Sequence, residues 1–261
     1  MTNPTLPTLL DFALDAVHQI GRLTLGHFHT RLDAERKADN TPVTIADKQA
    51  EEKLRDLIGK AWPAHGIIGE EFDAKLPASA DGYTWIIDPI DGTKSFVSGV
   101  PLYANLLALT KGREPVLGIA NFPALGEVLY ATKGGGCFWN GRAAHVSSVN
   151  QLKDAVLLVS GLNYFGAKEA AWQKLVEATY IQRTWGDAYG YFLVATGRAE
   201  IMLDPAMYLW DSAPFQVIIE EAGGVFTDWQ GTPTIYNGDS LAANAVLHPQ
   251  VIDIVKNACG D

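Results

Sequence analysis

Apolar residues recur at intervals of three and four positions in two segments near the start of the chain, and this spacing predicts two amphipathic helices. The first covers 8–28, and its apolar stripe includes Ala13 and Val17; the second covers 44–61, and its stripe includes Leu54. Each predicted helix begins at a threonine with an aspartate three residues later, a spacing typical of helix capping. These pairs are Thr8 with Asp11 and Thr44 with Asp47.

Shorter runs rich in β-branched and aromatic residues follow the second helix and predict strands. "TWIID" ends at Asp88, and three further runs between 102 and 134 are separated by the turn sequences "KGREP" and "PALG", which favours an antiparallel meander. Beyond residue 150, strand-like and helix-like segments alternate. The helices are expected at 167–179, 186–197, 211–222 and 248–258, and the strands at 155–161 and 199–204.

This order of elements predicts an α+β protein made of stacked layers of helices and sheets. The sheet-rich N-terminal half covers 1–150, and the alternating half covers 151–261. No long linker or low-complexity stretch separates the two halves. We therefore expect one core to cross the boundary, so that the chain folds as one continuous unit.

The composition is that of an ordinary globular protein, with 48% hydrophobic and 19% charged residues among 261. The formal net charge of −10 argues against a nucleic-acid partner, which would require a basic face. No apolar run is long enough to predict a membrane span, and the N-terminal segment predicts a helix instead of a signal peptide. Cys137 and Cys259 lie far apart and form no C-x-x-C pair, which favours free thiols in a reducing cytoplasm.

The stretch "DPIDGT", residues 88–93, holds two acids close together after an apolar run. Pro89 restricts the backbone of Asp88, and Gly92 allows a sharp turn after Asp91. Two carboxylates at this spacing repel each other unless a proton, a basic side chain or a metal ion lies between them. The alternative is an ordinary Asp-Pro turn followed by an Asp-Gly turn pair.

Two more acids lie next to apolar residues in distant segments. Glu70 follows an apolar pair in "IIGEEF", and Asp211 stands at a predicted helix start in "LWDSAP". Taken singly, Glu70 reads equally as a solvated loop acid, and Asp211 as a helix-capping one. Together with Asp88 and Asp91 they supply oxygen ligands from three segments, which is typical of a Mg²⁺ site. The sequence contains no zinc pattern, G-x-S-x-G elbow or phosphate-binding P-loop.

Three of these segments, "GEE" at 69–71, "WIIDPIDGTKSF" at 85–96 and "WDSAP" at 210–214, resemble the signature segments of the inositol monophosphatase family. The similarity extends from the first helix to about residue 258. It implies a layered α-β-α-β-α sandwich of the inositol-monophosphatase type. It also implies a lithium-sensitive hydrolase that removes phosphate from a small ester with two or three Mg²⁺ ions. Because the family is often dimeric, a homodimer is possible.

The resemblance further implies a role for each matching position. The metal ligands would be four carboxylates and one backbone carbonyl, on Glu70, Asp88, Ile90, Asp91 and Asp211. Asp88 matches an acid that bridges two ions, and the backbone N–H groups of Gly92 and Thr93 match donors to the phosphate. Thr93 and Asp47 match a pair that orients or deprotonates the attacking water, and the carboxylates of Glu70 and Asp47 can take up its proton. Asp47 alternatively serves only as the helix cap.

The substrate is expected to meet the second half of the chain. Asp187 stands where inositol monophosphatases usually have a small residue, and Asp204, seven residues before Asp211, matches an acid that meets the substrate. Two acids there favour an alcohol with a positive charge, such as histidinol, and "WGDAYGYFLVATGRAE" resembles the histidinol-phosphatase branch of the family, which implies a role in histidine biosynthesis. Arg183 matches an arginine near the substrate. The expected substrate-binding set is Glu70, Gly92, Thr93, Arg183, Asp187, Asp204 and Asp211.

Several alternatives remain at this point. Asp187 also fits a helix N-cap, and Arg183 fits a structural ion pair. The substrate could equally be inositol phosphate, another sugar phosphate or, with less support, a nucleotide 3′-phosphate. The alternative from another functional class is a catalytically inactive relative that serves as a binding or regulatory protein. The presence of all the ligand carboxylates and of Thr93 argues against it.

Overall fold

The computed structural model describes residues 4–30, 35–36, 42–79 and 82–259. The helices are α1 Leu6–His27, α2 Ile45–Ala61, α3 Thr93–Val97, α4 Glu169–Ala178, α5 Ala188–Ala195, α6 Leu209–Glu221 and α7 His248–Cys259. Short 3₁₀ helices cover Leu152–Asp154, Leu162–Tyr164 and Gly166–Lys168.

The strands of the N-terminal half are β1 Glu35–Arg36, β2 Pro42–Val43, β3 Gly66–Gly69, β4 Tyr83–Asp91, β5 Ala104–Lys111, β6 Glu114–Phe122, β7 Glu127–Thr132, β8 Gly136–Trp139 and β9 Arg142–Ala143. Those of the C-terminal half are β10 Val156–Leu158, β11 Ile181–Arg183, β12 Ile201–Asp204, β13 Gly224–Thr227 and β14 Ser240–Asn244.

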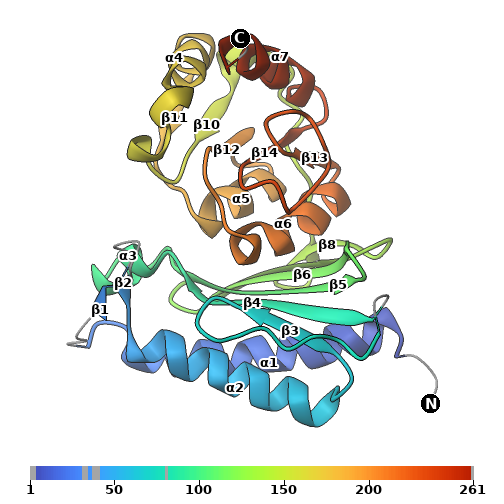
Figure 1. Ribbon diagram of the computed structural model, residues 1–261. Helices are drawn as coiled ribbons and strands as arrows, with labels where there is room; N and C mark the ends of the chain where they lie inside the picture. The colour runs from blue at the N-terminus through green and yellow to red at the C-terminus, as the bar shows by residue number, and fades with distance from the viewer. Residues whose placement is uncertain (1–3, 31–34, 37–41, 80–81, 260–261) are drawn as a thin grey trace.

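The elements stack in five layers, as Figure 1 shows. Helices α1 and α2 cover one face of a seven-stranded sheet, and α5 and α6 lie between that sheet and a five-stranded one, whose far side carries α4 and α7. This arrangement confirms the expected α-β-α-β-α sandwich. None of the helices in the described part of the chain is long and apolar enough to cross a membrane.

The larger sheet has the strand order β3-β4-β5-β6-β7-β8-β9. Strand β3 is parallel to β4, and the strands that follow form the expected antiparallel meander. The smaller sheet has the order β11-β10-β12-β14-β13 and is mixed. The sequence pattern did not predict β14, although this strand lies inside the smaller sheet and is buried along its length.

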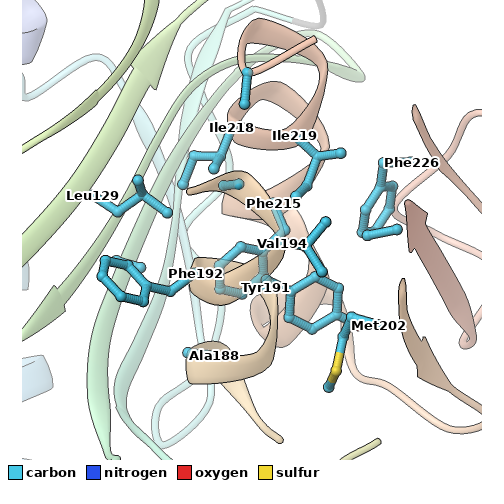
Figure 2. Packing of buried hydrophobic residues seen from close by; sticks show 14 of the residues in the cluster. Leu129, Ala188, Tyr191, Phe192, Val194, Met202, Phe215, Ile218, Ile219 and Phe226 are labelled. Carbon is cyan, nitrogen blue, oxygen red and sulfur yellow. The ribbon is translucent and has the colours of Figure 1, made fainter. Parts of the chain in front are cut away.

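Alternate residues of the strands divide the core among the layers. Trp85 and Ile87 of β4 pack with α1 and α2, whereas Ile86 faces α5 and α6. The middle cluster draws on both halves of the chain: Figure 2 shows Leu129 on one side of Tyr191 and Phe226 on the other. Because this cluster is shared, we propose that the halves 1–150 and 151–261 fold as one unit.

The structure corrects one predicted helix start and confirms the other. Helix α1 begins at Leu6 with Thr5 as N-cap, whose hydroxyl accepts the Thr8 N–H at 3.4 Å, so the expected Thr8–Asp11 pair is wrong. Pro7 explains the earlier start, because proline fits the first helical turn, where its missing N–H costs nothing. Thr44 caps α2 in a capping box with Asp47, as the sequence indicated.

Strand β4 is longer than "TWIID" and contains both acids of the "DPIDGT" stretch. The pairing with β5 runs from Tyr83 to Asp88, shifts register, and resumes at Asp91. Pro89 lies inside this shift, where a residue without an N–H is tolerated. Its carbonyl accepts a hydrogen bond from Asn105 Nδ2 at 2.7 Å. The alternative of an Asp-Pro turn at Asp88 is therefore wrong, because this point is a β-bulge, and the sharp turn predicted at Gly92 is confirmed.

Candidate functional site

One cavity of about 490 Å³ is lined by residues from both halves of the chain. Its walls include six carboxylates: Glu70, Asp88, Asp91, Asp187, Asp204 and Asp211. Among the described residues that line it, Lys94 is the only one with a basic side chain. The cavity wall is thus far more acidic than the chain as a whole, which has 30 acidic and 20 basic residues, and this charge needs a physical explanation.

Three of these acids form a tight cluster. One oxygen each of Asp88, Asp91 and Asp211 lies within 4.8 Å of the others. The bulge at the end of β4 brings Asp88 and Asp91 to the cavity, and the first turn of α6 brings Asp211. Backbone N–H groups hold all three: Ile90 N donates to Asp88 Oδ1 (3.0 Å), Ala188 N to Asp91 Oδ2 (2.6 Å) and Tyr208 N to Asp211 Oδ2 (2.9 Å).

Glu70 reaches the same cavity through strand pairing. The parallel register aligns Gly69 at the end of β3 with Ile87 of β4, so the next residue along each strand is Glu70 and Asp88. Glu70 is partly buried and lines the cavity. Its charge is one of the repulsions that raise the pKa of Asp88. Glu70 is therefore part of the acidic group and not a solvated loop acid.

Burial and mutual repulsion disfavour ionisation of this group. Burial, followed by the charges of Glu70 and Asp91, raises the pKa of Asp88 well above its usual value. Burial and then Asp187 do the same for Asp91. The pKa of Asp211 rises to about 7, mainly because of burial. The cluster is short of positive charge at neutral pH.

Asp47 and Thr93 meet at the edge of this group. Asp47 Oδ2 accepts hydrogen bonds from Thr44 N (2.8 Å) and Thr44 Oγ1 (2.6 Å), which caps α2. Its other oxygen, Oδ1, accepts from Thr93 Oγ1 at 3.5 Å, and the same hydroxyl lies 3.0 Å from the Ile90 carbonyl. Asp47 can therefore both cap α2 and act with Thr93, because each role uses a different carboxylate oxygen.

Gly92 is required by the backbone and by its neighbour. It has φ +75, in the left-handed region that favours glycine. A Cβ at this position would stand 3.2 Å from Asp187 Oδ2. Asp187 thus packs directly against the turn that carries Thr93, and this contact joins the start of α5 in the second half to the "DPIDGT" segment of the first.

Asp187 and Asp204 are the remaining aspartates that line the cavity. Asp204 is 3% exposed, and it accepts hydrogen bonds from Ser160 N at Oδ1 (3.1 Å) and from the Tyr191 hydroxyl at Oδ2 (2.8 Å). Asp187 occupies the N-cap position of α5, but its side chain makes no capping hydrogen bond, and its φ of 51° is unusual for a non-glycine residue. Burial and then Asp204 raise its pKa to about 6.

The structure adds cavity residues that sequence reasoning missed. Ser160 and Tyr191 hold Asp204, and Tyr208 and Trp210 line the wall as a stacked aromatic pair with ring centroids 5.1 Å apart. Tyr191 lies on an apolar helix, and only the contacts of its hydroxyl with Asp204 and Ser240, on other elements, show that it has a polar role. For Tyr208 and Trp210 the signal was available, since both flank the motif acid Asp211.

Two expected site residues do not line the cavity: Asp47, which is fully buried and contacts Thr93, and Arg183. Arg183 is exposed, donates from Nη1 to the Gln182 carbonyl at 2.8 Å, and lies 5.8 Å from the Trp185 ring. Strand β11, which ends at Arg183, is the edge strand of the smaller sheet. A direct contact of Arg183 with a substrate remains a prediction.

The fold and the acidic cavity together define a class of layered α+β proteins with a polyacidic centre, and comparisons identify the family. The sequence matches the inositol monophosphatase family over residues 6–259. The chain therefore belongs to the inositol monophosphatase family.

Named relatives agree with this membership. A histidinol-phosphatase from Chlorobaculum parvum is 41% identical over 95% of this chain and 96% of its own length. One from Mycobacterium tuberculosis is 36% identical over 91% and 93%. Among solved structures, an inositol monophosphatase from Thermotoga maritima superposes with a TM-score of 0.86 at 31% identity, covering 96% of this chain and 98% of that one.

The acidic cluster makes the stability of the metal-free protein depend on pH. A carboxyl whose pKa is raised on folding binds more protons in the folded state, so its contribution to stability is lost as the pH rises through the folded pKa. For Asp187 and Asp211 these values are about 6 and about 7. In excess chelator we expect the melting temperature to fall between roughly pH 5 and pH 8. Differential scanning calorimetry measures this fall directly.

Two variants make the test specific. Asp211→Asn should flatten the pH dependence, because it removes one of the titrating groups, whereas Asp253→Asn on the exposed side of α7 should leave it unchanged. A melting temperature that rose over the same pH range in wild type would contradict the account.

Proposed function

We propose that the protein is a Mg²⁺-dependent phosphomonoesterase that hydrolyses L-histidinol phosphate to L-histidinol and phosphate. The observation that carries the proposal is the acidic cavity, in which Asp88, Asp91 and Asp211 converge and Asp187 and Asp204 line the same wall. The relatives named histidinol-phosphatase support the choice of substrate.

The oxygen donors around Asp88, Asp91 and Asp211 fit Mg²⁺. They are the carboxylate oxygens of Asp88, Asp91, Asp211 and Glu70 and the carbonyl of Ile90, all hard oxygen donors. The raised pKa values show a deficit of positive charge that divalent cations would offset. Bound Mg²⁺ would offset the charge of the phosphate, lower the pKa of the attacking water and stabilise the leaving oxygen.

The residues of the chain then position the reactants. Thr93 Oγ1 and Asp47 Oδ1 lie 3.5 Å apart and together orient the attacking water, and the carboxylates of Asp47 and Glu70 take up its proton. The backbone N–H groups of Gly92 and Thr93 donate to the phosphate oxygens. In this way the turn after β4 serves both the acids and the phosphate.

The part of the cavity lined by Asp187 and Asp204 receives the alcohol portion of the substrate. Asp204 is buried and both of its oxygens already accept hydrogen bonds, so it mainly adds negative potential and fixes the wall. Asp187, which lies beside Gly92, is the acid that meets the ammonium group. The stacked rings of Tyr208 and Trp210 offer flat aromatic surface to an imidazole.

The second candidate function is hydrolysis of inositol or another sugar phosphate, which the likeness to the Thermotoga maritima inositol monophosphatase favours. A neutral polyol can donate hydroxyl hydrogen bonds to the carboxylates of Asp187 and Asp204, but it lacks the cationic group that would make such a bond charge-assisted. Lithium sensitivity and a homodimer are proposed from the family resemblance. A cytoplasmic location is proposed from the spacing of the two cysteines.

A phosphate-release assay tests the function directly. With Mg²⁺, we expect turnover of histidinol phosphate to exceed that of inositol 1-phosphate and of adenosine 3′,5′-bisphosphate, and excess chelator should abolish it. A preference for inositol phosphate would reject the substrate but keep the phosphatase. Full turnover in chelator, or no turnover of any ester, would reject the metal-dependent enzyme.

The pair of Thr93 and Asp47 is tested with a double-mutant cycle. Thr93→Val keeps the shape but removes the hydroxyl, so it should lower kcat more than it raises KM, because the group acts mainly in the transition state. Asp47→Asn should behave alike. Kinetics of the double mutant should show less loss than the product of the single effects. Fully multiplicative losses would mean that Asp47 does not act together with Thr93 and serves only as the cap of helix α2.

Specificity is tested with Asp187→Ala. A charge-assisted hydrogen bond contributes about 1.5–3 kcal/mol, so kcat/KM for histidinol phosphate should fall about 10- to 100-fold. Turnover of glycerol 2-phosphate, which has no cationic group, should change little. The ratio of kcat/KM for the two substrates cancels the effect of general damage to the site. An equal loss for both substrates would show that Asp187 does not contact the cationic group of the substrate.

A further inference from the structure

A second polar cluster lies on helix α2, behind the segment that carries Glu70. Its centre is Glu51, whose side chain is 0% exposed. Arg55 Nε donates to Glu51 Oε1 at 2.8 Å, and the backbone N–H of Glu71 donates to Oε2 at 2.8 Å. A buried carboxylate is costly unless it is paired in this way. Glu51 does not line the cavity, so it has no direct use there.

The same cluster fixes the chain on both sides of Glu70. After Glu70, Arg55 Nη2 donates to the Phe72 carbonyl at 2.9 Å, and its guanidinium lies 5.8 Å from the Phe72 ring. Before Glu70, the backbone of Gly69 packs against Glu51 so closely that a Cβ there would stand 2.0 Å from Oε1. Only a glycine fits at this point.

These contacts begin where the strand pairing ends. Strand β3 stops at Gly69, so the following residues are not held by a β-ladder. Glu51 also lies one helical turn after Asp47, on the same face of α2, and both side chains are buried. One rigid helix thus supports the segment of Glu70 with one turn and contacts Thr93 with the turn before it.

We propose that Glu51 and Arg55 are positioning residues that hold Glu70 toward the metal site and so set the affinity of that site for its ion. The inference rests on the metal site proposed above. A buried ion pair is in general a weak source of stability, which favours a role in fixing geometry. Groups that orient metal ligands typically change metal affinity by about 10- to 100-fold when they are removed.

The test measures metal binding without turnover. Mn²⁺ is titrated into the chelator-treated full chain, and bound metal is followed by the loss of the free-ion electron paramagnetic resonance signal. The variants are Glu51→Gln and Arg55→Gln, each alone and combined with Glu70→Gln. Glu52→Gln is the matched control, because Glu52 is the next residue on α2 and is exposed. Circular dichroism melting confirms that each variant is folded.

We expect Glu51→Gln and Arg55→Gln to weaken, by about 10-fold or more, the Mn²⁺ binding step that Glu70→Gln also weakens. Glu52→Gln should not change it. In the Glu70→Gln background the same changes should add less than about twofold, because their effect acts through Glu70. If Glu51→Gln fails to fold, Arg55→Gln decides, since it keeps the contact between Glu51 and the Glu71 N–H.

Unchanged Mn²⁺ affinity in a folded Arg55→Gln variant would overturn the proposal, as would an equal extra loss in the Glu70→Gln background. Either result with normal wild-type binding would leave the proposed function intact. Absence of Mn²⁺ binding to wild type would instead reject the metal site itself, and this inference with it.

Discussion

The repulsion among buried carboxylates is the constraint on which the structure of the site depends. Asp88, Asp91 and Asp211 bring oxygens within 4.8 Å of one another, and burial raises the pKa of each. The fold offsets part of this cost with backbone N–H groups, including that of Ala188, which comes from the opposite half of the chain. The site therefore exists only when the two sheets and the helices between them are assembled, and its remaining charge deficit would be offset by the divalent cations proposed to bind there.

Two acids of the site, Asp47 and Asp211, lie in the first turn of a helix. Asp47 and Asp211 each stand at the third position of a helix and use one oxygen to accept the N–H of the N-cap residue. This fixes the rotamer of the side chain and directs the other oxygen into the site. Capping and chemistry are thus not competing explanations for these acids, because the cap is what orients the carboxylate. The same logic extends to Glu51, one turn further along α2, whose buried carboxylate holds the segment of Glu70 from behind.

Local patterns predicted the layers and the acidic centre, but contacts between distant segments could not be derived from them. The Thr44–Asp47 cap and the meander follow from spacing alone. The end of β4 could not be predicted from spacing, because a proline is normally taken to end a strand unless the register shift that accommodates it is known. Ser160 and Tyr191 were missed because their partner Asp204 lies on another element. Arg183 was placed near the substrate by resemblance, whereas the path of the edge strand β11 leaves it outside the cavity wall.

The central claim is that the acids of the two halves meet around metal ions. It is tested most directly by diffraction from crystals grown with Mn²⁺, with data collected at the manganese absorption edge. The account predicts anomalous peaks between Asp88, Asp91 and Asp211, with Glu70 within coordination distance of at least one of them. Peaks elsewhere on the molecule, or a cluster that stays free of metal at Mn²⁺ concentrations that support turnover, would contradict it.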